Sequence, residues 1–459
     1  MKHLTPQIIA EVTGGEYIGD EAGRNVRVTG AVRDNRDVEP GNLFVCIRGA
    51  RVDGHSFASS AFMSGAACCL AEQVIPDATG PYVLVGSTLE SIRKIGAHHR
   101  SLFDIPVIGI TGSVGKTSAK ELVAATLGER FKVLKTLGNL NNELGVPLTL
   151  LSIDESHEAA VIEMGISDFG EMSRLAEMVR PDIFIMTKIG YSHLKELGDL
   201  NGVLRAKTEA FAYMKPDSVA VLNGDDELLW GYDPGKRKIT FGLLQRNDLR
   251  AEDVRTEGAE AVIFEAVSES GRFTVKIPSY GGHLVSLALS AIAVGRLLGM
   301  KDEEISSGLL SFVPVGGRSN VTQTGSIVLI DDCYNANPDS VEAALLSLSE
   351  LPGRRVAILG DMLNLGPESD KLHYEAGVFA ARNGIDILVS CGKEALFIRD
   401  GYNAALGRES YHFNTNDDVI AMLPGLIKKD DAVLVKASNS MRFNEITAAL
   451  KGGAIAHSK

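Results

Sequence analysis

The 459-residue sequence lacks a surplus of basic residues, a cysteine spacing typical of metal sites, and an apolar run long enough to cross a bilayer. Its formal net charge of −13 argues against a nucleic-acid scaffold, because such proteins bind phosphates through a basic face. Five scattered cysteines predict reduced, buried thiols rather than disulfides. The N-terminal residues lack the apolar stretch of a signal peptide, so we expect a cytoplasmic protein without membrane insertion.

The sequence also lacks a G-x-G-x-x-G fingerprint, internal repeats and low-complexity tracts, so dinucleotide binding is not supported. Its hydrophobic content of 45% and its 48 glycines are typical of an α/β protein with tight turns between strands and helices. A chain of 459 residues exceeds one ordinary core and predicts two or three domains. We place three domains, at 1–102, 103–314 and 315–459, with a linker candidate at 312–317.

The first segment mixes short strands with polar turns. Residues 43–47 predict a buried strand, and residues 58–67 predict a helix of small residues. Because no general catalytic pattern occurs here, a substrate-holding module is the default interpretation.

In the two later segments strands alternate with helices, which predicts parallel sheets with helices on their faces. Predicted strands lie at 106–110, 159–163, 182–187, 218–222, 327–330, 355–359, 385–389 and 432–435. Polar residues follow these strands at the sheet edge where open α/β sheets bind ligands. The last segment therefore predicts a Rossmann-like domain.

The stretch TGSVGKTS (111–118) follows a predicted strand and precedes a predicted helix at 119–127. Such a strand, glycine turn and helix start place backbone N–H groups around one anion, and the helix dipole adds positive charge. We expect Lys116 to reach the outer phosphates of ATP or GTP and Thr117 to ligate Mg²⁺. A bare GKT also occurs in surface turns, and Ile110 stands where the full pattern has glycine. The predicted phosphate-binding residues are Gly112, Ser113, Val114, Gly115, Lys116, Thr117 and Ser118.

Three residues carry both a chemical and a plainer interpretation. Glu163 ends an apolar strand, where it is either a Mg²⁺ ligand beside the phosphate loop or a helix cap. His193 follows another predicted strand, and a solvated or hydrogen-bonded bystander is its plainer interpretation. Lys207 lies on a helix of mixed charge, where a surface lysine is the plainer interpretation.

Two stretches are rich in amides. Residues 136–147 hold three asparagines in four positions, which suit sugar or phosphate oxygens, although a plain loop remains the alternative. Residues 331–340 place acids and asparagines after a predicted strand. Asp339 or Ser340 could merely cap the following helix, but Asp332 and both asparagines exceed what capping needs.

Taken together, these stretches resemble the Mur ligases over nearly the whole chain, and most closely the D-alanyl-D-alanine-adding (MurF-type) branch. The motifs that carry the resemblance are TGSVGKTS (111–118), NLNNELGVPLTLL (139–151), VIEMG (161–165), IGYSHL (189–194), RAKTE (205–209), LNGDD (222–226), DDCYNANPDS (331–340) and ILGDMLNLG (358–366). The stretch VRDNRDVEPGNLFVCIRGARVDGHSF (32–57) resembles the UDP-sugar module of the family.

The resemblance implies a three-domain α/β fold. A small α/β domain would bind the UDP-N-acetylmuramoyl tripeptide, a central parallel-sheet phosphate-loop domain would bind ATP, and a C-terminal Rossmann-like domain would help bind the nucleotide and D-Ala-D-Ala. The implied reaction forms an amide bond in peptidoglycan precursor synthesis, through an acyl phosphate on the peptide carboxylate and a tetrahedral intermediate. Under this interpretation we expect a cytoplasmic monomer that binds no nucleic acid.

The resemblance also implies roles for individual residues. His193 matches a ligand of a second Mg²⁺, and Lys207 matches a lysine that the family carbamylates with CO₂. Arg318 matches an arginine on the ATP phosphates, Asp332 an acid at the ribose, and Asn335 and Asn337 line the nucleotide cleft. The implied metal set is Thr117, Glu163, His193 and carbamylated Lys207, and the implied catalytic set is Lys116, His193 and Lys207. The implied UDP-substrate set is Asn35, Arg36, Arg48, Asp53, His55, Thr136, Asn139, Asn141 and Asn142.

The chain departs from the family pattern at three places. Asn35 stands where the family has serine, Leu287 where it has an asparagine near the adenine, and Asn439 where it has an arginine. The alternatives are a sister ligase that adds lysine or diaminopimelate, and a non-catalytic nucleotide-binding regulatory protein. The Asp-Asn-Pro-Arg motif of the sister branch is absent, and a pure binding module has no use for a carbamylated lysine.

Overall fold

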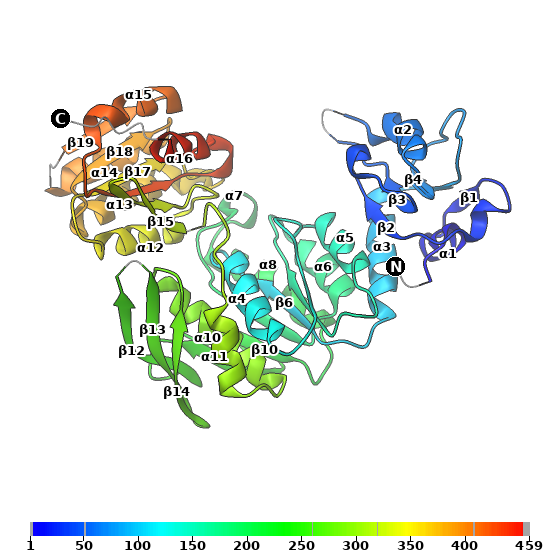
Figure 1. The fold of residues 1–459 in the computed structure, drawn as a ribbon, viewed down its shortest axis with the longest axis horizontal. Coiled ribbons are helices and arrows are strands. Elements are labelled where there is room, and N and C mark those ends of the chain that lie inside the picture. Colours follow the sequence, from blue (N-terminus) through cyan, green and yellow to red (C-terminus); the bar gives the residue numbers. More distant parts are fainter. Residues whose placement is uncertain (1–2, 50–51, 259, 319, 407–408, 453–459) are drawn as a thin grey trace.

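The computed structural model describes residues 3–49, 52–258, 260–318, 320–406 and 409–452. These residues form three sheets that follow one another along the chain, with the central one between the other two (Figure 1). The α/β class predicted from the sequence is confirmed. None of the helices in the described residues is both long and apolar enough to cross a lipid bilayer. The exact domain boundaries stay a prediction.

The first sheet has the strand order β1-β5-β4-β3-β2 and carries short helices. Its elements are α1 (Pro6–Thr13), β1 (Glu16–Ile18), η1 (Gly23–Asn25), β2 (Gly30–Val32), η2 (Asn35–Asp37), β3 (Asn42–Val45), η3 (Gly54–Phe57), α2 (Ala58–Met63), β4 (Cys68–Ala71) and β5 (Tyr82–Leu84). The predicted strand at 43–47 is β3, and it is fully buried. The helix predicted to reach residue 67 ends at Met63, because the chain turns at Gly65, whose φ is +96°.

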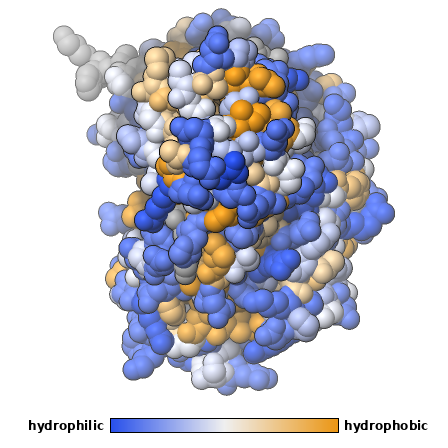
Figure 2. Space-filling view, turned by 90° about the vertical axis from the view of Figure 1, so that its right-hand side faces the viewer, coloured by the Kyte–Doolittle hydropathy of each residue, from blue (hydrophilic) through white to orange (hydrophobic). Residues whose placement is uncertain are grey.

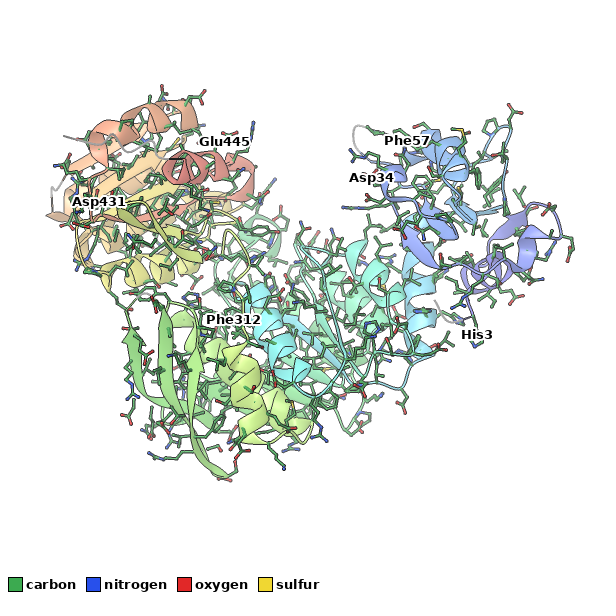
Figure 3. All side chains as sticks on the ribbon, in the orientation of Figure 1. His3, Asp34, Phe57, Phe312, Asp431 and Glu445 are labelled. Atoms are coloured by element: carbon green, nitrogen blue, oxygen red, sulfur yellow. The ribbon has the colours of Figure 1, made fainter. Side chains whose placement is uncertain are left out.

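The side of this region that carries Asp34 and Phe57 is turned toward the C-terminal region (Figure 3). The opposite face, at the right-hand side of Figure 1, is mostly hydrophilic, with small separate groups of hydrophobic residues (Figure 2).

Helix α3 (Thr88–Ser101) connects the first sheet to the central region and packs against α5 and α6. At this junction Glu143 accepts hydrogen bonds from both Arg93 of α3 and Arg174 of α6. The junction is therefore fixed by apolar packing and by one shared carboxylate.

The central sheet has the order β14-β13-β12-β11-β10-β9-β6-β8-β7. Its strands are β6 (Val107–Thr111), β7 (Val133–Lys135), β8 (Ala159–Glu163), β9 (Ile183–Met186), β10 (Val219–Asn223), β11 (Arg237–Gly242), β12 (Leu249–Glu257), β13 (Ala261–Ser268) and β14 (Gly271–Ile277). Its helices are α4 (Lys116–Gly128), α5 (Gly145–Leu151), α6 (Glu171–Val179), α7 (Leu194–Leu197), α8 (Leu200–Thr208), η4 (Glu209–Tyr213), α9 (Glu227–Trp230), α10 (His283–Leu297) and α11 (Asp302–Leu310).

The four strands predicted for the central segment are confirmed as β6, β8, β9 and β10. The expectation of a wholly parallel sheet is wrong at one edge, since β12 pairs with β13 and β13 with β14 in antiparallel register. A tight turn at 269–270 joins β13 to β14 without the crossover helix that a parallel pair requires. The parallel part, from β7 to β12, carries the strand ends that surround the phosphate loop.

The third sheet has the order β15-β16-β20-β17-β18-β19 and is parallel except for β15 against β16. Its strands are β15 (Asn320–Thr324), β16 (Ile327–Asp331), β17 (Arg355–Gly360), β18 (Ile387–Cys391), β19 (Glu409–Phe413) and β20 (Ala432–Lys436). Its helices are α12 (Pro338–Ser349), η5 (Gly366–Glu368), α13 (Ser369–Arg382), α14 (Ala395–Leu406), α15 (Asn416–Leu426), η6 (Asn439–Met441) and α16 (Asn444–Lys451). The Rossmann-like prediction is confirmed in β16 to β20. One buried apolar cluster joins this region to the central one, since it holds both Phe184 and Ile330.

Candidate active site

The phosphate loop lies between the C-terminal end of β6 and the start of α4. Gly112 and Gly115 have φ values of +152° and +84°, which L side chains rarely adopt. A Cβ at Gly112 would stand 2.0 Å from the Thr187 hydroxyl at the end of β9. The glycines therefore let the loop curl closely against the neighbouring strand end, with its N–H groups beside the first turn of α4.

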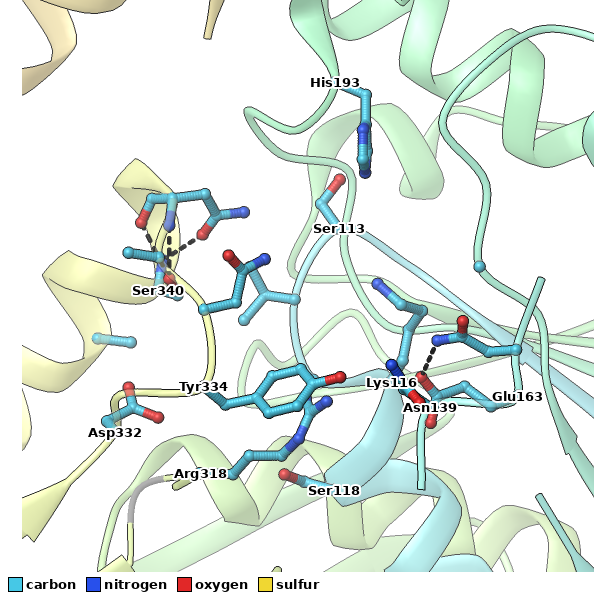
Figure 4. Close-up of a pocket in the computed structure, with 18 of the residues that line it drawn as sticks. Ser113, Lys116, Ser118, Asn139, Glu163, His193, Arg318, Asp332, Tyr334 and Ser340 are labelled. Carbon is cyan, nitrogen blue, oxygen red and sulfur yellow. Dashed lines mark hydrogen bonds between the residues drawn. The ribbon is translucent and has the colours of Figure 1, made fainter. Parts of the chain in front are cut away.

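Lys116 projects from the first position of α4 (Figure 4), and its Nζ donates to the carbonyl of Gly112 at 2.7 Å. Burial lowers the pKa of Lys116 below its ordinary value, the Glu163 carboxylate acts to raise it, and the Arg318 guanidinium lowers it further. The lysine is held against its own loop, within reach of an anion placed there.

Glu163 ends β8 and is 1% exposed. Its Oε2 accepts from the Thr117 hydroxyl at 2.8 Å, and its Oε1 accepts from the Asn141 amide at 2.7 Å. Carboxylate and hydroxyl oxygens are the ligands that Mg²⁺ prefers, so this pair fits the predicted metal site. Within the described part of the chain no three acidic, histidine or cysteine side chains gather around one point. A cation here would complete its shell with water and phosphate oxygens.

His193 and Lys207 both lie near Lys116, whose charge acts on each of them. His193 precedes α7 with a left-handed φ of 53°, and burial together with the charges of Lys207 and Lys116 lowers its pKa to about 4. Lys207 is only 2% exposed on α8, and burial, followed by the charge of Lys116, lowers its pKa well below the ordinary value. The surface-lysine interpretation of Lys207 is therefore wrong.

Two adjoining cavities meet at Ser113, Lys116 and His193. The first, of about 390 Å³, is also lined by Val114, Gly115, Ser118, Asn139, Asn141, Asn142, Glu163, Gly165, Ile166, Ser167, His283, Arg318, Asp332, Tyr334, Asn335, Ala336, Asn337, Ser340, Ala343, Ala344 and Lys436. The second, of about 280 Å³, is also lined by Ile166, Tyr191, Ser192, Lys207, Asn335, Ala336, Asn337, Leu363, Asn364, Ser438, Asn439 and Ser440. The cavities combine a phosphate-loop wall with a wall from the third sheet.

On the third-sheet wall, the Arg318 guanidinium lies over the Tyr334 ring, 3.8 Å from its centroid (Figure 4). Asp332 pairs with the buried Lys436 at 2.5 Å, so its carboxylate already has a cation on one side. Asn335 and Asn337 line both cavities, and Asn337 also caps α12. The predicted nucleotide residues of both segments thus come together in one place.

The predicted UDP-substrate residues of the first region contact neighbouring residues of that region. The Asn35 amide donates to Ser60 at 3.1 Å, and the exposed Arg36 pairs with Asp34. The Arg48 side chain is 59% exposed, and its Nε lies 3.4 Å from the Asp53 carboxylate.

His55 is nearly buried in this region. Its Nδ1 contacts Asp53 at 2.6 Å, its Nε2 accepts from the Glu72 N–H at 2.8 Å, and the residue is 7% exposed. Both ring nitrogens thus have partners within this region, and the substrate role of His55 stays a prediction.

The predicted substrate residues of the central region divide in the same way. Thr136 is fully buried and its hydroxyl accepts from the Glu163 N–H at 3.0 Å, and its substrate role stays a prediction. Asn141 supports Glu163, and the Asn142 side chain accepts from the Gly145 N–H at the start of α5. Asn139 is exposed and lines the first cavity.

Sequence reasoning missed three side chains of the first cavity: Tyr334, Lys436 and His283. Tyr334 lies in the middle of a stretch that we read only for its acids and asparagines. Lys436 ends a strand, and only the fold places it beside Asp332. His283 opens α10, and its Nδ1 is buried without a hydrogen-bond partner among the described residues. A polar residue at a strand or helix end was the available signal in each case.

Comparison with known protein families gives three matches along the chain. Residues 27–88 match the model of the Mur ligase family catalytic domain, residues 110–295 the Mur ligase middle domain, and residues 317–439 the Mur ligase glutamate ligase domain. The order of the three matches is the order of the three sheets.

Individual proteins give the same result. The UDP-N-acetylmuramoyl-tripeptide–D-alanyl-D-alanine ligase of Bacillus subtilis (strain 168) is 34% identical over 448 residues, covering 96% of this chain and 97% of the relative. The Escherichia coli (strain K12) protein of the same name is 34% identical, covering 94% and 96%. Among solved structures, MurF from Acinetobacter baumannii superposes with a TM-score of 0.89 at 29% identity, covering 98% of each chain. MurF from Thermotoga maritima in complex with ADP gives 0.83 at 28% identity, covering 94% and 98%. The chain belongs to the Mur ligase family.

Proposed function

We propose that this chain is an ATP-dependent ligase that joins D-Ala-D-Ala to the peptide carboxylate of a UDP-N-acetylmuramoyl tripeptide. The observation that carries the proposal is that two cavities meet at Lys116. The residues predicted to bind the nucleotide line the first cavity, and His193 and Lys207 line the second. The full-length relatives bear the name of this activity, and a solved relative was crystallised with ADP.

The arrangement suits activation of a carboxylate. Lys116 and the loop N–H groups would hold the ATP phosphates, and Arg318 would add a second cation from the third-sheet wall. The peptide carboxylate attacks the γ-phosphorus, an O–P bond forms and ADP leaves. The dipeptide amine then attacks the acyl carbon, loses a proton and expels phosphate through a tetrahedral intermediate. The side chains supply positioning and charge neutralisation rather than a covalent bond.

We propose Mg²⁺ at Thr117 and Glu163, where a bound ion would neutralise charge that develops on the phosphoryl oxygens. The donor set fits, because Glu163 is held in place by Thr117 and Asn141. We place a second ion at His193 together with a carbamylated Lys207. The low pKa of His193 favours this role, because a neutral imidazole is the metal-binding form.

Carbamylation of Lys207 is supported by its environment. In the described residues no carboxylate pairs with its buried amine, and the charge of Lys116 disfavours the ammonium form. A neutral amine attacks CO₂, forms an N–C bond and releases one proton, which leaves an anion in place of a cation. That anion would lie in the same cavity as Lys116 and His193, where it would suit a metal site. The cytoplasmic location and monomeric state stay predictions.

The test is ADP formation by the purified chain with ATP, Mg²⁺, the UDP-muramoyl tripeptide and an acceptor panel, with mass analysis of the UDP product. We expect ADP formation to require D-Ala-D-Ala and the product to gain the dipeptide. L-lysine or diaminopimelate should give neither. Turnover with L-lysine would indicate the sister ligase, and nucleotide binding without any product would indicate a regulatory protein.

A further inference from the structure

Asp339 lies where the third-sheet region meets the central region. It is the second residue of α12, a place where an acid commonly serves the helix itself. Here the capping is done by Asn337, whose side chain accepts from the Ser340 N–H at 3.0 Å. Asp339 is therefore not required as the cap, and its carboxylate contacts another part of the chain.

The carboxylate of Asp339 reaches the loop that follows β9. Its Oδ2 accepts from the Tyr191 N–H at 2.9 Å, and its Oδ1 lies 2.6 Å from the Lys188 ammonium. The Asp339 side chain is only 12% exposed. Hydrogen bonds to an ionised group in such a place are shorter and stronger than neutral ones.

Gly190 lies between these two partners and leaves the space that Asp339 occupies. A Cβ on Gly190 would stand 2.2 Å from Oδ2 of Asp339. The φ of Gly190 is not in the left-handed region, so its backbone suits any L residue. Space for the Asp339 carboxylate, rather than backbone conformation, is what demands glycine here.

The same loop is bonded to the phosphate loop on its other side. The Ser113 hydroxyl both donates to the Gly190 carbonyl and accepts from the Gly190 N–H, each at 2.9 Å. The Ser113 N–H donates to the Lys188 carbonyl at 2.8 Å. A continuous set of hydrogen bonds therefore runs from the phosphate loop through residues 188–191 to the start of α12.

We propose that Asp339 is a positioning residue. Its carboxylate occupies the space beside Gly190 and holds the third-sheet region in a fixed position relative to the phosphate loop. Residues 335–337 directly precede α12, so docking at Asp339 sets where their side chains stand in both cavities. The effect expected on turnover rests on the proposed ligase function, whereas the effect on docking does not.

The docking at Asp339 is not the only contact between the two regions. The Tyr280 hydroxyl donates to the Ser347 carbonyl at 3.2 Å, and the backbone at Gly366 packs against Lys195. Loss of Asp339 should therefore loosen the docking without detaching the region. Since a misplacement of about 1 Å can cost about 100-fold in rate, we expect Asp339→Ala to lower kcat about 10- to 100-fold. ATP binding by the phosphate loop should be little changed.

The experiment compares Asp339→Ala, Asp339→Asn, Gly190→Ala and the double variant Gly190→Ala/Asp339→Ala. Asp339→Asn keeps an acceptor for the Tyr191 N–H and should retain part of the lost rate. Gly190→Ala should be the most impaired, because the methyl group and the carboxylate cannot share the space. Removing the carboxylate relieves this clash, so the double variant should recover to the level of Asp339→Ala alone. Lys276→Met is the matched control: it breaks the exposed pair of Lys276 on β14 with Glu257 on β12 and should keep wild-type rates.

A second readout does not need turnover. Small-angle scattering of the same proteins should show a larger radius of gyration for Asp339→Ala and Gly190→Ala, but not for Lys276→Met. Multiplicative losses in the double variant would overturn the proposal, as would an Asp339→Ala protein with unchanged kcat and scattering. If wild type forms no product, the ligase function fails while the scattering still tests the docking. If Gly190→Ala does not fold, the proposal is tested by comparing kcat and the radius of gyration of Asp339→Ala with those of Asp339→Asn.

Discussion

Two fully buried lysines on opposite walls of the paired cavities differ in what surrounds them. Lys436, on the third-sheet wall, is 2% exposed, pairs with Asp332 at 2.5 Å and donates to the Asn335 carbonyl at 2.9 Å. Lys207, on the central wall, is equally buried, but in the described residues no carboxylate pairs with it and its charged neighbour is Lys116.

The difference separates a lysine that holds structure from one that is available for chemistry. A buried charge is stable when it is paired and hydrogen-bonded, as Lys436 is. Burial and a neighbouring cation both favour the neutral, nucleophilic form of an amine, and Lys207 has both. The two lysines are therefore distinguished by their charged partners and not by their burial.

The largest loss of activity is expected when Lys207 is replaced. Lys207→Ala should lower kcat about 1000-fold, because the proposed anion beside the metal site is lost. The fold should remain intact, since the removed amine has no ion pair to leave behind. Steady-state ADP formation and a thermal melt measure both effects.

Added formate or acetate should return part of the activity to this variant by replacing the missing carboxylate. Lys207→Arg, which keeps a cation, is the control and should not respond. An untreated Lys207→Ala protein with full activity would contradict the carbamate role.

Lys436→Met tests the opposite wall. Removing one partner of a buried pair leaves the other charge in a poor environment, so we expect a loss of about 3 kcal/mol in the free energy of unfolding. Asp332→Asn in the same chain should recover part of that stability. Chemical denaturation of the single and double variants gives the two numbers. A Lys436→Met protein as stable as wild type would show that the pair adds nothing to the fold.

Glu143 extends the comparison to a paired acid at the junction of α3 with the central region. Burial raises its pKa, but hydrogen bonding to Arg174 and the charges of Arg174 and Arg93 outweigh burial and hold the pKa below its ordinary value. Its contribution to stability is therefore present above the unfolded pKa of about 4.3 and is lost as pH falls through the lower folded pKa.

Glu143→Gln should cost about 1–3 kcal/mol at pH 7 and progressively less below pH ~4. Denaturation of both proteins across this range measures the difference. A cost that stays constant with pH would contradict the ionic account.

The smallest effect is expected at Arg48, whose pair with Asp53 is largely in solvent. Arg48→Ala should change the free energy of unfolding by less than about 1 kcal/mol, because exposed pairs contribute little. If Arg48 contacts the UDP substrate as predicted, KM for that substrate should rise several-fold with kcat unchanged. An unaltered KM would remove Arg48 from the predicted substrate set.

The sequence predicted the strands and the phosphate loop well, because apolar runs, glycines and a following helix are local patterns. The antiparallel strands β12 to β14 were missed although they are consecutive in the chain, because β12 is exposed over its last five residues and shows no apolar run. The burial of Thr136 and His55 could not be predicted, because sequence shows residue types but not burial. The burial of Lys207 could not be predicted either, because a helix of mixed charge gave no sign that this lysine faces inward. Contacts between regions, such as Asp339 with the loop after β9, arise only from the fold.

We infer above all that the phosphate loop serves to activate a carboxylate. The direct measurement uses a UDP-muramoyl tripeptide labelled with ¹⁸O in its terminal carboxylate, together with ATP, Mg²⁺ and D-Ala-D-Ala, and reads the mass of the released phosphate. We expect one ¹⁸O in each phosphate, because the bridging oxygen of the acyl phosphate leaves with phosphorus when the amine attacks. Unlabelled phosphate, formed at the same rate without the dipeptide, would show that water rather than the carboxylate takes the phosphoryl group.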